Sequence, residues 1–108
     1  MTLAELGDIL KGIDGFADKV VYGAWQAQTA PTPPLICYEE TRSGNFFADG
    51  IEYHTGHDVR ISLCTLYKDI GTEALVEAAL TAAGIAWTSA EQYIDEDKIN
   101  IKTYEIEV

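Results

Sequence analysis

Apolar positions recur at helical spacing in the first part of the chain. Four of them follow at intervals of three and four residues, which places them on one face of a helix. They are Leu3, Leu6, Leu10 and Ile13. Thr2 and Glu5 have the spacing of a capping box, in which two side chains bond the first backbone N–H groups of a helix. The pattern therefore predicts a helix that begins after Thr2 and that Gly12 or Gly15 ends.

Strand-like runs follow this helix. The β-rich run 20–25 predicts a strand with a bulge at Gly23, and the run 35–40 predicts another. Between them, 26–34 contains three prolines, which cannot donate to a strand ladder. Turn residues occupy 41–45.

The clearest alternation lies in the middle of the chain. A short alternating segment occupies 51–54, and a longer strand is expected at 57–67. One face of the longer strand is expected to be buried. That face comprises Val59, Ile61, Leu63, Thr65 and Tyr67.

A second helix is expected after Gly71. Thr72 can cap it, Glu73 lies in its first turn, where the helix dipole favours an anion, and Gly84 stands where a left-handed residue ends many helices. Its predicted buried stripe is Leu75, Ala79 and Ala82, widened by Ala78, Leu80 and Ala83.

The chain is expected to end in two strands, one that starts at 85–87 and one at 98–108. The last strand contains a change of phase, because its isoleucines at 99 and 101 have one parity and Tyr104, Ile106 and Val108 have the other. A strict pleat sends the two sets to opposite faces. Either a bulge near 102–103 restores one face, or the two halves pack against different partners.

The order helix, strands, helix, strands predicts an α+β fold, a largely antiparallel sheet packed by two helices. A chain of 108 residues is expected to form a single domain, 1–108. Hydrophobic residues make up 47% and charged residues 23%, as in globular proteins.

Charge narrows the classes of partner. Eighteen acidic against seven basic residues give a formal charge of −11, so non-specific attraction to nucleic acid or to an anionic membrane is not expected. The apolar runs fall short of the roughly 20 residues that span a bilayer, and the first residues lack a secretory signal pattern.

Candidate chemistry is sparse. Cys37 and Cys64 lie in apolar runs and are interpreted as reduced thiols in a reducing compartment, with a cross-strand disulfide or redox pair as the alternative. His54 and His57 with nearby carboxylates could hold a metal, but they lack a third ligand at a defined spacing and are interpreted as surface histidines. The acidic run 95–97 is interpreted as a solvated loop rather than a calcium site.

We therefore expect no catalytic residues, no cofactor and no metal site. Cys64 with one of the two histidines is the one Cys–His combination to consider, and Arg60 is the one nearby cation that could lower a thiol pKa.

Aromatic residues suggest a protein interface instead. Phe46 and Phe47 are adjacent in a turn-rich segment, beside Asn45 and Asp49. Exposed rings of this kind anchor protein interfaces. The alternative is that one or both rings fold back over the core. The candidate interface residues are Asn45, Phe46, Phe47 and Asp49.

Taken together, several segments resemble small structural proteins of tailed phages and prophages. The segments are 20–25, 33–38, 45–50, Tyr53, 59–65, 68–69, 91–96 and 104–106. The resemblance is to tail-completion or tail-terminator proteins of siphophages that infect Gram-positive hosts. It extends from about residue 20 to the end of the chain.

The resemblance implies the tail-terminator fold and a homo-oligomeric ring, a hexamer, that caps the tail tube. The implied partners are the chain itself, the tail tube protein and the head–tail connector protein. The implied location is the head–tail junction of the virion, and the host cytoplasm before assembly. Unpaired strand edges suit ring assembly, and an acidic lumen would let DNA pass without binding. The alternatives are a head–tail connector or stopper component and a small acidic inhibitor that mimics nucleic acid.

Overall fold

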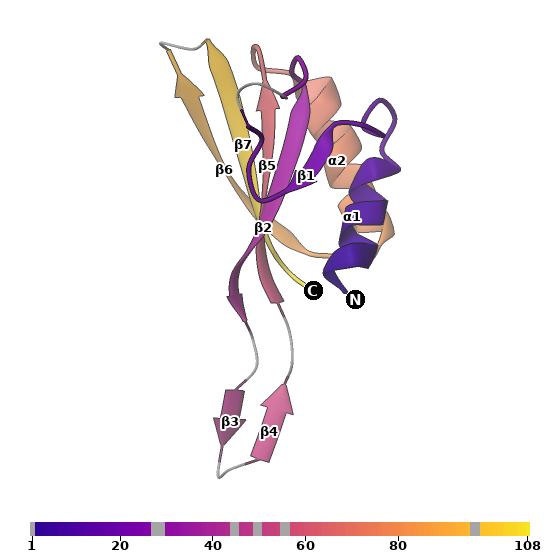
Figure 1. Cartoon of the computed structure of the whole chain (residues 1–108), viewed down its shortest axis with the longest axis vertical. Helices are drawn as coiled ribbons and strands as arrows, with labels where there is room; N and C mark the ends of the chain where they lie inside the picture. The colour runs from indigo at the N-terminus through magenta and orange to yellow at the C-terminus, as the bar shows by residue number, and fades with distance from the viewer. Residues whose placement is uncertain (1, 27–29, 44–45, 49–50, 55–56, 96–97) are drawn as a thin grey trace.

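The computed structural model of the chain describes residues 2–26, 30–43, 46–48, 51–54, 57–95 and 98–108. Two helices cover one face of a five-stranded sheet, and a separate pair of strands projects beyond it (Figure 1). The helices are α1 (Leu3–Lys11) and α2 (Ile70–Ala82). The strands are β1 (Val20–Tyr22), β2 (Leu35–Ser43), β3 (Phe46–Ala48), β4 (Ile51–His54), β5 (His57–Thr65), β6 (Trp87–Ile94) and β7 (Ile99–Glu107). The predicted α+β fold is confirmed.

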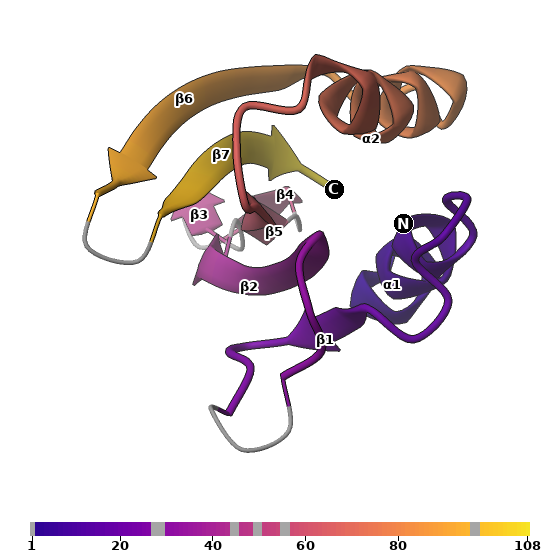
Figure 2. The same cartoon turned by 90° about the horizontal axis from the view of Figure 1, so that it is seen from above.

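The main sheet has the strand order β1-β2-β5-β7-β6. β1 pairs with β2 in parallel, and the remaining neighbours in this sheet pair antiparallel. Seen from above, α1 and α2 lie on the same side of the sheet (Figure 2). The molecule is elongated, with extents of 50 × 28 × 24 Å, because β3 and β4 continue its long axis away from the sheet (Figure 1). Among the described helices, none is long and apolar enough to cross a bilayer.

The hydrophobic core lies between the helices and the sheet face that they cover. The predicted helical face of α1 is confirmed, since Leu6 and Leu10 are fully buried. The capping box is also present: Thr2 Oγ1 accepts from the N–H of Glu5 at 3.0 Å, and Glu5 Oε1 accepts from the N–H of Thr2 at 3.1 Å. The sheet contributes Val20, Ile36, Tyr38, Val59, Ile61, Leu63, Tyr104 and Ile106.

Helix α1 approaches β2 closely at Gly7. A Cβ atom added to Gly7 would lie 2.5 Å from the hydroxyl oxygen of Tyr38, which is itself a core residue. Helix and strand can pack at this distance because the position carries no side chain.

Helix α2 buries part of the predicted stripe, since Leu80 is buried and Ala79 packs against the core, but it also buries two residues outside that stripe. Val76 and Leu80 face the core and Glu73 is also buried, whereas Leu75 is 45% exposed. Alanines of α2 lie on several sides of the helix, so its apolar pattern is nearly uniform and spacing alone does not identify the buried face. The buried acid was the unexpected member of the true stripe.

Helix α2 also begins earlier than predicted. Its N-cap is Asp69, whose carboxylate accepts from the hydroxyl of Thr72 at 2.7 Å and from the N–H of Thr72 at 3.1 Å. These two bonds lower the pKa of Asp69. Thr72 is therefore a donor to the cap rather than the cap itself. Glu73 in the first turn and the left-handed Gly84 (φ 75°) after the helix are confirmed.

Strand β2 runs through Ser43, where the sequence predicts a turn. The register with β5 shifts at Thr41, which is an extra residue and forms a β-bulge. Beyond the bulge, Arg42 and Ser43 pair with Asp58 and His57. This cross-strand pairing, which depends on distant residues, extends the strand.

Two other strand ends differ from prediction. Gly23 is not a bulge inside a strand but follows β1 with φ 93°, and its N–H donates to the carbonyl of Tyr38 at 2.8 Å. β5 ends at Thr65, so Tyr67 does not continue its buried face and is 65% exposed.

The phase change in the last strand is explained by the two faces of β7. The register of β7 with both β5 and β6 is unbroken, so no bulge restores the pattern. Tyr104 and Ile106 are buried under the helices, while Ile99 and Ile101 are half-buried on the opposite face. The two halves of the strand therefore face opposite sides of the sheet.

Candidate protein-interaction surfaces

Strands β3 and β4 form a projecting two-stranded arm (Figure 1). They pair antiparallel, with Phe46 opposite His54 and Phe47 opposite Glu52. In the described part of the chain, each contacts the other far more than it contacts any other element. A two-stranded ribbon alone is marginally stable in water. The arm is thus suited to packing or pairing with another chain.

The arm holds two of the four predicted interface residues. Phe46 and Phe47 lie in β3, and the backbone of β3 runs beyond the main sheet rather than back over the core (Figure 1). Asn45 and Asp49 lie outside the described residues. That these four residues form an interface stays a prediction.

The base of the arm is fastened to the main sheet by hydrogen bonds. The ring of His57 contacts the carboxylate of Glu40, and the hydroxyl of Thr41 donates to the carbonyl of Asp58 at 3.2 Å. His57 and Val108 exchange two backbone bonds, at 2.7 and 2.9 Å. The ends of β2 and β5 that lead to the arm are therefore held in place on the main sheet.

The residues considered for chemistry do not converge. His54 ends β4 in the arm, His57 begins β5 and contacts Glu40, and Cys64 lies at the far end of β5. Among the residues that the structure describes, no group of three potential ligands could hold a metal ion. Cys37 and Cys64 are free thiols on neighbouring strands, and burial raises the pKa of both. A nucleophilic thiolate requires the opposite shift.

Strand β6 is a long exposed edge of the main sheet. It pairs with β7 on one side, and the side chains of 88–93 are exposed on both of its faces. Its one charged residue is Glu91, which forms an ion pair with Lys68 at 2.7 Å. The opposite edge differs, because β1 has only three residues.

An apolar surface lies at the end of the body opposite to the arm. Leu66, Tyr67 and Ile70 follow β5 and are 49%, 65% and 71% exposed. Leu66 and Tyr67 line a hollow of about 130 Å³ together with Pro33 and Pro34. We call these five residues the end patch. Grouped exposed apolar residues of this kind mark sites of protein contact.

An ion cluster around one buried carboxylate holds the start of α2 against β7. Glu73 is 5% exposed, and its carboxylate lies 2.9 Å from Lys68 Nζ and 3.7 Å from Lys102 Nζ. Lys68 also contacts the carboxylate of Glu91. Hydrogen bonds to Glu91, and to a smaller extent to Glu73, raise the pKa of Lys68. A buried carboxylate needs such partners. Sequence reasoning missed this cluster because its members come from four separate segments.

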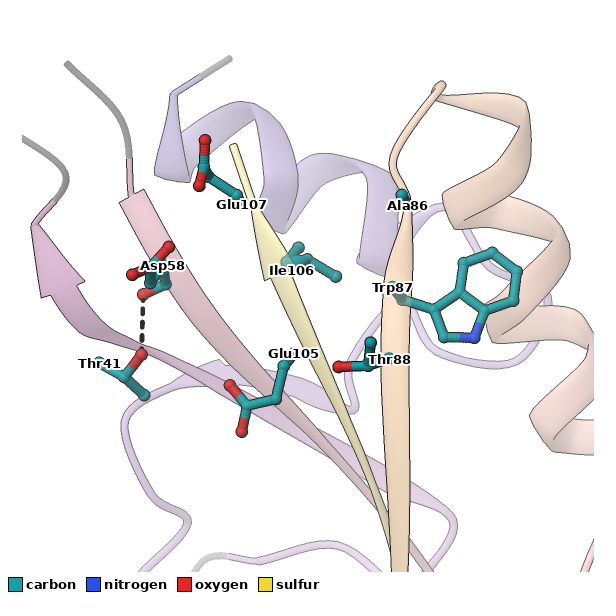
Figure 3. A pocket seen from close by; sticks show the side chains of 8 residues that line it. All are labelled: Thr41, Asp58, Ala86, Trp87, Thr88, Glu105, Ile106 and Glu107. Atoms are coloured by element: carbon teal, nitrogen blue, oxygen red, sulfur yellow. Dashed lines mark hydrogen bonds between the residues drawn. The ribbon is translucent and has the colours of Figure 1, made fainter. Parts of the chain in front are cut away.

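A shallow hollow of about 440 Å³ lies beside the start of β6 (Figure 3). It is lined by Thr41, Asp58, Ala86, Trp87, Thr88, Glu105, Ile106 and Glu107. Glu105 accepts from Arg60 Nε at 2.7 Å, and the ring of Trp87 turns towards α2, where it meets Tyr104 edge-on. The acidic groups Asp58 and Glu107 also interact within the chain. The hollow is therefore a gap between strand ends, and its acidic residues already interact with other groups of the chain.

The fold can be compared with those of known proteins. No family model and no curated protein matches the chain. Among solved structures, a chain of "Virion of native gene transfer agent (GTA) particle" matches with a TM-score of 0.63 and 13% identity. The match covers 93% of this chain and 87% of that chain. At this identity the comparison shows a shared fold.

Proposed function

We propose that this chain is a structural protein of a tailed phage, prophage or phage-like particle, located in the virion. The observation that carries the proposal is the shared fold with a virion chain over nearly the full length of both. The sequence resemblance to tail-completion proteins, reached from the residues alone, supports the same class. Within this class the chain acts by assembly, without catalysis or a cofactor.

More specifically, we propose a homo-oligomeric ring, a hexamer, that caps the tail tube and joins it to the head connector. The two ends of the elongated body differ, because the two-stranded arm lies at one end and the apolar end patch at the other (Figure 1). Copies arranged side by side around an axis would present one of these surfaces to the tube and the other to the connector. The formal charge of −11 would disfavour DNA binding in the lumen.

Deletion of the gene from the phage or prophage that encodes it tests the proposal. Loss of a terminator leaves tube growth unchecked, so we expect overlong tails without heads in electron micrographs. Wild-type protein supplied in trans should restore tails of normal length. Tails of normal length attached to heads in the deletion strain would refute the virion role, and normal tails separated from heads would support the connector alternative.

The same assay tests the arm. Complementation with Phe46→Ala combined with Phe47→Ala should fail, because the arm then lacks its adjacent rings. Leu75→Ala is the matched control, since it removes an apolar side chain that is 45% exposed on α2 and belongs neither to the arm nor to the end patch. Equal rescue by the arm variant and the control would show that the arm is not a docking element.

A further inference from the structure

We propose that the free chain forms a two-fold dimer in which the β6 edges of two copies pair antiparallel and join two five-stranded sheets into one. The partner is a second copy of this chain. The inference stands apart from the proposed function, because a two-fold contact is closed by two copies and describes the protein before any ring forms.

The edge is accessible along its length. Side chains at 88–93 are exposed on both faces of β6, so neither helix overhangs the strand. β6 has eight residues, and its backbone groups on the side away from β7 face outwards. An incoming strand can therefore approach without displacing part of the chain.

The edge also lacks most of the features that usually block strand addition. Natural edges are protected by charged side chains, above all lysine, by proline, by bulges or by short length. The one charge on β6, Glu91, is paired with Lys68. β6 contains neither lysine nor proline, and its register with β7 is unbroken over Trp87–Ile94. The neighbouring cation, Lys68, forms ion pairs with Glu73 and Glu91. Its charge is therefore already neutralised by groups of the same chain.

The sequence of β6 is self-complementary in one register. With Ala90 opposite Ala90 of the second copy, Trp87 lies opposite Tyr93, Thr88 opposite Gln92, and Ser89 opposite Glu91. The two residues of each pair point to the same face of the joined sheet. Trp87, Ser89, Glu91 and Tyr93 lie on the helix face of β6, and Thr88 and Gln92 lie on the opposite face. Aromatic pairs across strands are favourable.

Neighbouring registers are worse. A shift that puts Glu91 on the two-fold axis places two like charges opposite each other, which is destabilising. A shift in the other direction, with Ser89 on the axis, places Trp87 opposite Glu91 and leaves Tyr93 without an aromatic partner. The arm of another copy is a weaker occupant, because β3 and β4 have only three and four residues.

The dimer should be weak and should respond to salt. Edge pairing buries little surface compared with a standard stable interface. Two copies each carry a formal charge of −11, so their mutual repulsion opposes association until salt screens it. The dimer fraction should therefore rise with protein concentration and with ionic strength.

Cysteine cross-linking tests the register. In a chain with Cys37→Ser and Cys64→Ser, we would add Ala90→Cys and oxidise with copper–phenanthroline. We expect a covalent dimer to form at least ten times faster than with Thr88→Cys, whose predicted partner is Gln92, or with Ala78→Cys, which is exposed on α2. Equal rates for the three variants would overturn the proposal.

Sedimentation of the otherwise unmodified chain gives an independent test. Ala90→Lys sets two cations against each other on the axis and should abolish the dimer, whereas Ala78→Lys, with the same change of charge, should leave it unchanged. Circular dichroism would check that both variants fold. A monomer at all concentrations and salt levels, or a dimer that Ala90→Lys leaves intact, would refute the proposal. A hexamer unaffected by Ala90→Lys would refute it while supporting the ring.

Discussion

The body of the fold and the arm contain similar apolar and aromatic residues but use them differently. In the body, β5 lies between two paired neighbours, and Val59, Ile61 and Leu63 are at most 1% exposed beneath the helices. In the arm, β3 and β4 have only each other as paired strands. Burial of apolar surface is the main favourable term in folding. The body therefore carries its own stability, whereas the stability of the arm depends on what it meets.

Hydrogen exchange should show the largest contrast between these two regions. Amides of β5 are expected to open only with global unfolding, at about 5–15 kcal/mol. Amides of β3 and β4 should open locally at near-zero cost, since a two-stranded ribbon is marginal. Mass spectrometry of exchanged peptides measures both in one sample. Equal protection in the isolated protein would contradict the comparison.

Truncation of apolar side chains should separate the regions next. Leu63→Ala removes a fully buried side chain and should cost about 2–5 kcal/mol of unfolding free energy. Phe46→Ala combined with Phe47→Ala should cost less than about 0.5 kcal/mol, because the backbone of β3 runs beyond the main sheet and its core (Figure 1). Urea unfolding followed by circular dichroism measures both. A large loss from the arm variant would favour the alternative in which the rings cover the core.

Close packing inside the body gives a third, smaller effect. Gly7→Ala places a Cβ atom against the hydroxyl of Tyr38 and should cost about 1–3 kcal/mol. Gly12→Ala is the matched control, because Gly12 has φ −76° and its added Cβ would lie 3.4 Å from the nearest atoms. The control should leave the unfolding free energy unchanged or slightly higher. Equal destabilisation of the two variants would show that the approach of α1 to β2 is not tight.

The smallest effect concerns the cap of α2. The bonds from Thr72 lower the pKa of Asp69 in the folded chain. The charged cap therefore stabilises the fold above the unfolded pKa, about 3.9, and this contribution is lost as pH falls through the lowered folded pKa. The difference in unfolding free energy between wild type and Asp69→Asn should be largest at neutral pH and should vanish in acid. Asp14→Asn controls for net charge, and a pH-independent difference would contradict the assignment.

Local signals in the sequence predicted much of the body. The Thr2–Glu5 capping box and the alternation in β5 are decided by neighbours close along the chain, and both are confirmed. Other features of the body depend on pairing between strands that are distant in the sequence. The extension of β2 to Ser43 depends on contact with His57 and Asp58, and no local pattern contains that information.

The candidate surfaces show the same division. The aromatic pair Phe46–Phe47 was visible in the sequence, but its position on a separate ribbon followed only from the strand pairing. The buried face of α2 was predicted only in part, because an acid such as Glu73 is expected to be exposed unless partners such as Lys68 and Lys102 lie beside it. Residue patterns indicate which side chains favour burial, and the fold decides which of them obtain it.

The bulge at Thr41 has a consequence for how the sequence on either side of it is read. One extra residue in β2 shifts the odd–even parity of the residue numbers that lie opposite a given face of β5, because side chains in a strand alternate with a period of two. Deleting that single residue would leave the partners on either side unchanged, with Glu40 opposite Val59 and Arg42 opposite Asp58, and would join them into one regular ladder. The gain or loss of one codon at this position is therefore a step that the chain can take without re-pairing the two long strands.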